Sequence, residues 1–318
     1  MDRRIESVLD EARLLGASDV VLKEDQKVIY RILGKLTESD QIVSSDELEK
    51  FTSFLRPAGY VQEYLGGVSG MDASFEYHGR YRVNCFSSMG KRCAAMRVIS
   101  DEIRSLSALG LPENLADRVT GRKGLSLIVG KTGAGKSTTL AAITQNILRS
   151  EKVHIITLED PVEYKYTRMK GEITQREMGT DFPGFEIGIQ DALRQSPDYI
   201  VIGEIRTVSA LKAAISAAEA GHGIIGTIHS IGAARTLTRM LSMFSEPEKE
   251  FIRYQLSANL NFILSQKLTY GEMEAQLDYE LMLNIPSMEN TIREGRFSQI
   301  DNLILLGEKQ GMKRFKTK

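Results

Sequence analysis

The stretch "GLSLIVGKTGAGKS", residues 124–137, decides the fold. It begins with a short apolar run that is typical of a buried strand, and Gly130–Ser137 then fit the pattern G-x-x-x-x-G-K-[ST]. Residues 137–150 are predicted to form a helix. A chance match to this pattern is much rarer between a strand and a helix than elsewhere. The context therefore favours a nucleotide-binding loop over an ordinary glycine-rich turn.

The residue types in this loop suit a nucleoside triphosphate. The glycines let the backbone curl so that its N–H groups point at phosphate oxygens, and the helix N-terminus favours an anion. Lys136 supplies a charge for the β and γ phosphates, and the Ser137 hydroxyl can ligate Mg²⁺. We therefore expect ATP and Mg²⁺ as cofactors. The predicted loop consists of Gly130, Lys131, Thr132, Gly133, Ala134, Gly135, Lys136, Ser137 and Thr138.

Beyond the loop, short apolar strands alternate with helices, which predicts an α/β domain with a parallel sheet. The further strands are "VHIITLED" (153–160), "DYIVIGE" (198–204) and "GIIGTIH" (223–229). Polar residues stand at or just after their ends: Glu159, Asp160 and Glu163, then Glu204, then His229. Ligands of open parallel sheets bind outside the carboxyl ends of the strands, so these side chains are expected on one rim.

The remainder of this domain, from about Ser245, is predicted to be largely helical. Its expected apolar face consists of Phe251, Ile252, Leu256, Leu260, Ile263 and Leu264.

Residues 1–104 are predicted to form a small α+β domain, joined by a linker (105–122) to the α/β domain (123–318). Helices are expected near 5–15 and over 44–55, strands over 19–23 and 27–33, and a hairpin over 73–86. Alternation in "GRYRVNCF" puts Arg80 and Arg82 on one strand face, and Arg97 lies on the next predicted strand.

Composition narrows the possible functions. The chain has 318 residues, of which 42% are hydrophobic and 26% charged, as in ordinary globular proteins. A net charge of −1 gives no electrostatic case for nucleic acid, so a nucleic-acid motor is the least favoured alternative. Two cysteines exclude a four-cysteine zinc site and suit a reducing cytoplasm. No apolar run approaches the roughly 20 residues that span a bilayer, so we expect no direct membrane insertion.

Four segments then carry a specific resemblance. "GLSLIVGKTGAGKSTTLAAI", "IITLEDPVEYK", "LRQSPDYIVIGEIRT" and "AAEAGHGIIGTIHS" are similar to the Walker A, Asp box, Walker B and His box of the bacterial type II/IV secretion ATPase superfamily. Within it, the chain resembles the type IV pilus retraction ATPases, the PilT and PilU group. Assembly ATPases generally carry a tetracysteine zinc insertion that two cysteines cannot supply. "GEIRT" is closer to PilU than the "GEMRD" frequent in retraction members.

The resemblance implies a fold and roles for the site residues. The fold would be a PAS-like α+β domain followed by a RecA-like ATPase domain. Glu204 would organise Mg²⁺ and Glu163 would position or deprotonate the attacking water, although Glu204 stays open as the base. His229 would sense the nucleotide. Arg80, Arg82 and Arg97 would close over the γ phosphate from the same or a neighbouring subunit, the alternative being an exposed basic strand face.

The resemblance also implies a task. The chain would be a cytoplasmic, homohexameric ATPase motor that drives pilus retraction and twitching motility. It would act at the inner membrane through a platform protein, and a paralogous pilus ATPase is a further partner that the resemblance allows. Two alternatives stay open, a secretion-system ATPase and a PilU-like accessory nucleotide-binding subunit of a paired motor.

Overall fold

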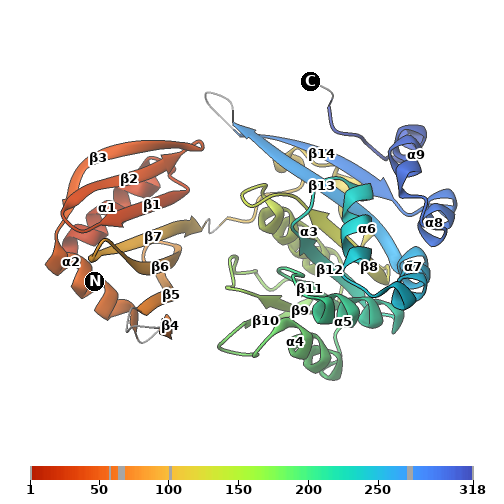
Figure 1. Ribbon diagram of the computed structural model, residues 1–318, viewed down its shortest axis with the longest axis horizontal. Helices are drawn as coiled ribbons and strands as arrows, with labels where there is room; N and C mark the ends of the chain where they lie inside the picture. Colours follow the sequence, from red (N-terminus) through yellow and green to blue (C-terminus); the bar gives the residue numbers. More distant parts are fainter. Residues whose placement is uncertain (1, 57–58, 64–68, 100–101, 271–274, 317–318) are drawn as a thin grey trace. The chain divides into compact units, whose positions relative to one another are not determined.

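The computed structural model describes residues 2–56, 59–63, 69–99, 102–270 and 275–316 (Figure 1). By its contacts the chain divides into two compact units. The first is Met1–Glu102 with Tyr270–Ala275, and the second is Ile103–Thr269 with Gln276–Lys318. Among the described residues, the helices are all too short or too polar to span a lipid bilayer.

The first unit is built on an antiparallel sheet in the order β3-β2-β1-β7-β6-β5-β4, with two helices (Figure 1). The strands are β1 (Asp19–Lys23), β2 (Gln26–Ile32), β3 (Lys35–Val43), β4 (Gly59–Glu63), β5 (Ser69–Glu76), β6 (Arg80–Ser88) and β7 (Lys91–Ile99). The helices are α1 (Arg3–Leu14) and α2 (Ser45–Leu55). This arrangement is the α+β fold expected for the N-terminal part.

Burial and capping explain these helices. Ile5, Val8, Leu9 and Ala12 of α1 are all buried, as their helical spacing predicts. The capping box of Ser44 and Glu47 begins α2. The predicted hairpin is confirmed, since Glu76 stands opposite Arg80 across β5 and β6. The polar strand β3 was not predicted, because most of its side chains are exposed and show no apolar alternation.

The second unit is built on a sheet in the order β10-β9-β11-β12-β8-β13-β14. From β10 to β13 in this order, neighbouring strands pair in parallel. The strands are β8 (Gly124–Val129), β9 (His154–Glu159), β10 (Glu172–Glu177), β11 (Tyr199–Ile202), β12 (Gly223–Ile228), β13 (Leu260–Tyr270) and β14 (Ala275–Leu283). The four strands expected from the sequence are β8, β9, β11 and β12, and their parallel pairing is confirmed. Every residue of β8, β11 and β12 is buried, which explains their continuous apolar sequences.

Helices connect these strands (Figure 1). They are α3 (Lys136–Ser150), α4 (Phe185–Ala192), α5 (Val208–Glu219) and α6 (Ala233–Ser242). The chain leaves β8 through α3 to reach β9, on the far side of β12 and β11. After β9 the chain adds β10 at the edge of the sheet, and it then returns through β11 and β12 towards β8. Since crossovers are right-handed, this reversal puts α3 on the opposite face of the sheet from α4 and α5. Ligands bind where such an order reverses, beside the carboxyl end of β8.

The prediction that the chain is largely helical from about Ser245 is wrong for the segment after Asn259. Helix α7 (Glu246–Asn259) ends there, and Leu260, Ile263 and Leu264 belong to β13, which pairs with β8. Phe262, Ile263 and Leu264 form a short, buried apolar run, and periodicity does not separate such a run from a buried helix. The segment becomes helical again at α8 (Pro286–Arg293) and α9 (Ile300–Leu306).

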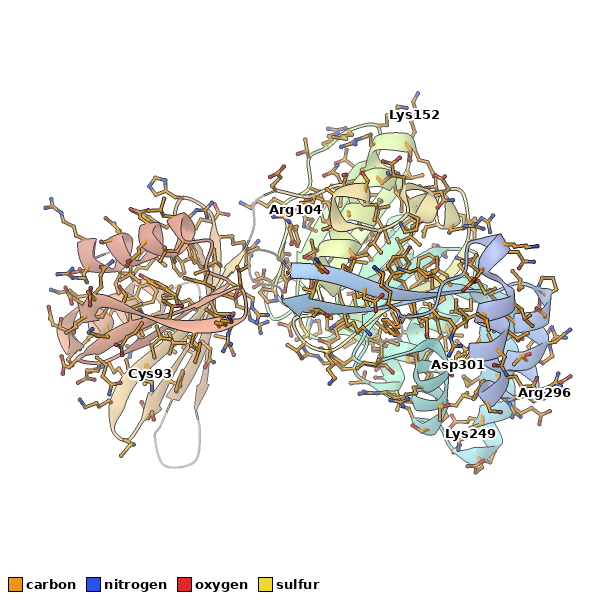
Figure 2. The ribbon with its side chains drawn as sticks, turned by 90° about the horizontal axis from the view of Figure 1, so that it is seen from above. Cys93, Arg104, Lys152, Lys249, Arg296 and Asp301 are labelled. Carbon is orange, nitrogen blue, oxygen red and sulfur yellow. The ribbon has the colours of Figure 1, made fainter. Side chains whose placement is uncertain are left out.

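Surface charges of both signs are spread over the second unit. Lys152, Arg296 and Asp301 are exposed, and Figure 2 labels them at separate places on this unit. The labelled positions thus match the balanced composition of the chain.

Candidate functional site

The phosphate-binding loop, Gly130–Ser137, connects β8 to α3. Gly133 and Gly135 adopt φ values of +74° and +80°, a conformation that disfavours any residue with a Cβ. Gly135 is the N-cap of α3 and has no side chain with which to cap it. The first N–H groups of α3 therefore remain available to an anion.

Lys136 lies inside the curl of this loop. Its side chain is buried, and Nζ donates to the carbonyl oxygens of Gly130 and Lys131, both at 3.0 Å. Burial lowers the pKa of Lys136, while the carboxylates of Glu204 and Glu163 oppose that shift. Both carboxylates thus act on this ammonium group through their charge.

Glu204 and His229 meet beside Lys136. Glu204 follows β11, His229 follows β12, and His229 Nε2 lies 3.0 Å from Glu204 Oε1. His229 Nδ1 lies 3.4 Å from Lys136 Nζ. Since Lys136 is only a donor, Nδ1 must accept and Nε2–H must donate to Glu204. Glu204 and His229, two of the residues expected on one rim, thus lie together beside Lys136 of the loop.

Charge and burial shift the pKa of Glu204 and the pKa of His229. Burial raises the pKa of Glu204, but Arg206, His229 and Lys136 together outweigh it and lower the pKa below 4.5. Burial, followed by the charge of Lys136, lowers the pKa of His229 below 6.5 against the pull of Glu204. At neutral pH the site therefore combines an ionised carboxylate with a neutral imidazole.

Arg206 is a site residue that the sequence analysis missed. Its guanidinium lies 2.6 Å from Glu204 Oε2 and 4.0 Å from Asp160 Oδ2. It thus joins the end of β11 to the segment after β9. Its place two positions after Glu204, in "GEIRT", was the available signal.

The segment after β9 carries Glu163. The backbone N–H of Glu163 donates to Glu159 Oε2 at 3.3 Å, so the buried Glu159 holds this turn. Thr157 and Gln175 also donate to Glu159, and burial raises its pKa. Glu159 thus serves the local fold, whereas Glu163 is partly exposed and lies close enough to Lys136 to affect its pKa. Thr138, at the end of the predicted loop, contacts the neighbouring Tyr164 hydroxyl at 3.0 Å.

Arg80, Arg82 and Arg97 belong to the first unit. Arg82 of β6 stands directly opposite Arg97 of β7 in the ladder. Like charges at directly opposed positions destabilise a sheet. Arg97 Nε donates to Asp19 at 3.2 Å, and Arg80 donates to Ser74 at 3.4 Å. These contacts lie within one sheet, and the role of the three arginines towards a nucleotide stays a prediction.

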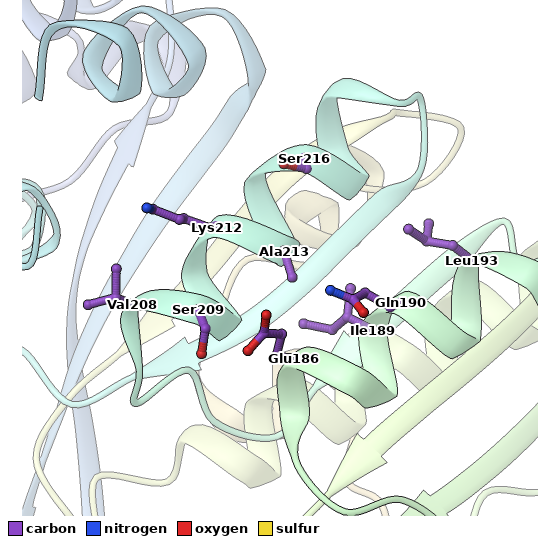
Figure 3. A pocket seen from close by; sticks show the side chains of 9 residues that line it. All are labelled: Glu186, Ile189, Gln190, Leu193, Val208, Ser209, Lys212, Ala213 and Ser216. Carbon is purple, nitrogen blue, oxygen red and sulfur yellow. The ribbon is translucent and has the colours of Figure 1, made fainter. Parts of the chain in front are cut away.

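Two other features lie away from the phosphate-binding loop. The residues of α4 and α5 line an open cavity of about 530 Å³, and Figure 3 shows side chains of both helices around it. None of its lining residues belongs to the predicted site. His222 precedes β12, where its carbonyl oxygen accepts from Gly124, the first residue of β8. His222 therefore lies at the amino end of β12, whereas His229 lies at its carboxyl end.

Comparison with known proteins agrees with this geometry. The family model described as "Type II/IV secretion system protein" matches residues 2–278. The Escherichia coli protein YggR is 38% identical over 74% of this chain and 73% of its own length. The Pseudomonas aeruginosa type IV pilus retraction ATPase PilT is 36% identical over 76% of this chain and 71% of its own length.

A solved structure of the pilus retraction motor PilT with bound ADP has a similar fold. It superposes with a TM-score of 0.82 at 32% identity, and the match covers 98% of this chain and 94% of that one. The predicted resemblance and the predicted fold class are thereby confirmed. The chain belongs to the type II/IV secretion system protein family, within which it is similar to the pilus retraction ATPase PilT.

Proposed function

We propose that this chain is a Mg²⁺-dependent ATPase that powers type IV pilus retraction as a homohexameric motor. The observation that carries the proposal is the convergence of Lys136, Glu204 and His229 at one phosphate-binding loop. This convergence occurs in a chain whose fold matches a pilus retraction motor over nearly its whole length. The same similarity supports action in the cytoplasm, at the inner membrane, through a platform protein.

The donor set suits both ATP and Mg²⁺. The loop offers N–H groups and the ammonium of Lys136 to the phosphates, and these are the groups that cradle β and γ phosphates. The Ser137 hydroxyl and the ionised carboxylate of Glu204 are hard oxygen ligands of the kind that Mg²⁺ prefers. The ion would neutralise charge on the phosphates. Glu204 would hold it directly or through water.

The carboxylates would position the attacking water, and His229 would respond to the phosphates. Glu163 is the proposed base, because its charge acts on Lys136 and Glu159 holds its backbone in place. Glu204 is the weaker candidate, since His229 and Arg206 engage both of its oxygens. His229 contacts Lys136 as well as Glu204, so a phosphate that draws Lys136 away would change its hydrogen bonding.

The hexamer and the arginines complete the proposal. Arg80, Arg82 and Arg97 would stabilise charge on the γ phosphate, from the same or a neighbouring protomer. The register supports this role, because Arg82 stands opposite Arg97 across β6 and β7 and two positive charges thus share one part of the sheet. Hydrolysis would then change the angle between the two units, and the ring would pass this motion to the platform protein.

Complementation tests the biological task. A strain that lacks this chain's gene would be restored with the wild-type chain or with Lys136→Ala. We expect only the wild type to restore pilus retraction, measured as twitching motility, because Lys136 is the charge inside the phosphate-binding loop. Normal retraction in the deletion strain, together with lost secretion, would reject the retraction proposal and favour a secretion ATPase.

The accessory-subunit alternative is supported by "GEIRT", the form closer to PilU. It predicts that the purified chain binds ATP but hydrolyses it no faster than Lys136→Ala. A measurement of ATP turnover therefore separates this alternative from the motor.

A further inference from the structure

Gln266 of β13 lies under the phosphate-binding loop and is not a member of any motif quoted above. Its side chain is 1% exposed, and Nε2 donates to the carbonyl oxygen of Ala134 at 2.7 Å. Because a carbonyl oxygen only accepts, the amide nitrogen must be the atom that faces Ala134. The bond therefore fixes the orientation of the Gln266 amide.

Both ends of the loop also pack on Gln266. A Cβ on Gly130 would lie 2.6 Å from the backbone oxygen of Gln266, a distance that side chains do not tolerate. A Cβ on Gly135 would lie 3.3 Å from Gln266 Nε2. The loop therefore curls around this one residue, which contacts its beginning, its end and a carbonyl oxygen between them.

The neighbouring residue of β13 holds the other loop of the site. Ser265 is fully buried, and its hydroxyl accepts from the backbone N–H of Gly232 at 2.8 Å. Gly232 follows His229 and precedes α6. Ser265 stands opposite Val129, the last residue of β8. Two consecutive residues of one strand thus bind the two loops that carry Lys136 and His229.

Stability alone does not explain an amide at this position. Gln266 Oε1 is buried and has no hydrogen-bond partner among the described residues. A buried acceptor without a partner costs free energy, which an apolar side chain of the same volume would avoid. The amide supplies a directed hydrogen bond to the carbonyl oxygen of Ala134, within the loop.

We propose that Gln266 is a positioning residue for nucleotide binding. It holds the phosphate-binding loop in its curled conformation, and with Ser265 it sets that loop against the loop of His229. The inference rests on the proposed binding of ATP at this loop. Its proposed effect on the phosphates is indirect, through the contacts of Gln266 with the loop.

The test compares Gln266→Met with Gln255→Met in the full-length chain. Methionine keeps the volume but cannot donate to Ala134. Gln255 is a buried glutamine of α7 that donates to Glu219 at 2.6 Å, outside the site, so it serves as the matched control. We expect Gln266→Met to weaken Mg·ADP binding by about tenfold, the loss of one net hydrogen bond. The control should bind as the wild type does and show a similar loss of melting temperature.

A second variant, Gln266→Glu, gives a readout that a structural role would not produce. An ionised carboxylate faces the Ala134 carbonyl without a proton, whereas a protonated one can donate to it. The ratio of its ADP dissociation constant to that of the wild type should therefore shrink as the pH falls from 8 to 6. Taking the ratio removes the titration of Lys136, Glu204 and His229, which both proteins share.

The outcomes separate the inference from the proposed function. A wild-type chain that binds no nucleotide would overturn both. Wild-type binding with a Gln266→Met affinity within twofold of it would overturn the inference alone, as would a Gln266→Glu ratio that does not change with pH.

Discussion

His229 links two charged groups, Lys136 through Nδ1 and Glu204 through Nε2. It can do so only as a neutral ring, because protonation would convert Nδ1 into a donor that faces an ammonium group. Burial and Lys136 lower its pKa below 6.5. The folded protein therefore binds the proton on this ring less readily than the unfolded chain.

A pH dependence of stability follows from this shift. As the pH falls through 6.5, the unfolded chain takes up the proton first, so the contribution of His229 to the free energy of unfolding declines. That contribution is fully present only above 6.5. We expect the wild type to lose stability relative to His229→Gln between pH 7.5 and 5.5. Guanidinium chloride denaturation of both proteins at the two pH values measures the difference.

A difference that stays constant over this range would contradict the assigned tautomer and the lowered pKa. A difference that grows in favour of the wild type at pH 5.5 would mean that Glu204 dominates and that the imidazole is charged when the chain is folded. Because His78, His154 and His222 are present in both proteins, their titration cancels in the comparison.

At the residue scale, the sequence predicted those groups that stand at strand ends. Lys136, Glu204 and His229 are each fixed by a short motif, and the parallel sheet brings the ends of β8, β11 and β12 together. Gln266 could not be predicted in this way. It lies far from the loop in sequence, on a strand that resembled a helix, and its function depends on one backbone contact.

Among the elements, the start of α6 depends on a buried carboxylate of β14. Glu280 Oε1 accepts from the N–H of Ala233, the first residue of α6, at 2.7 Å. Glu280 is buried, which raises its pKa, although this hydrogen bond opposes the shift. The carboxylate therefore caps the helix at the cost of a buried charge.

Two substitutions of Glu280 separate the cap from the charge. Glu280→Gln keeps an oxygen for Ala233 and removes the charge, so we expect no loss in the free energy of unfolding at pH 7. Glu280→Ala removes the acceptor and should cost about 1–2 kcal/mol. Chemical denaturation measures both values. Equal losses in the two variants would show that the charge, and not the hydrogen bond, stabilises α6.

Sequence periodicity does not identify every strand of the second unit. Strands β8, β9, β11 and β12 were predicted because each is a short apolar run next to a helix. Strand β10 was missed because its sequence, "EITQRE", is polar and none of its residues is buried. Strand β13 was taken for helix because β13 is buried and apolar over Phe262, Ile263 and Leu264. Only tertiary pairing with β8 distinguishes such a run from a helix.

The molecule as a whole joins a seven-stranded antiparallel unit to a RecA-like unit that contains the phosphate-binding loop. The fold class and the family could be predicted from the sequence, since four ordered motifs carry both. The positions of the arginines relative to the nucleotide could not, because Arg80, Arg82 and Arg97 lie on the other unit. Their role towards a nucleotide, from the same or a neighbouring subunit, stays a prediction.

The most direct test of the account is Mg²⁺-dependent ATP turnover, measured across the elution profile of a sizing column. We expect turnover in a fraction near six protomers, and a loss of about 10²–10³-fold in Lys136→Ala, because one preorganised charge on the phosphates is removed. Wild-type turnover no higher than that of Lys136→Ala in every fraction would contradict the proposal that this site hydrolyses ATP.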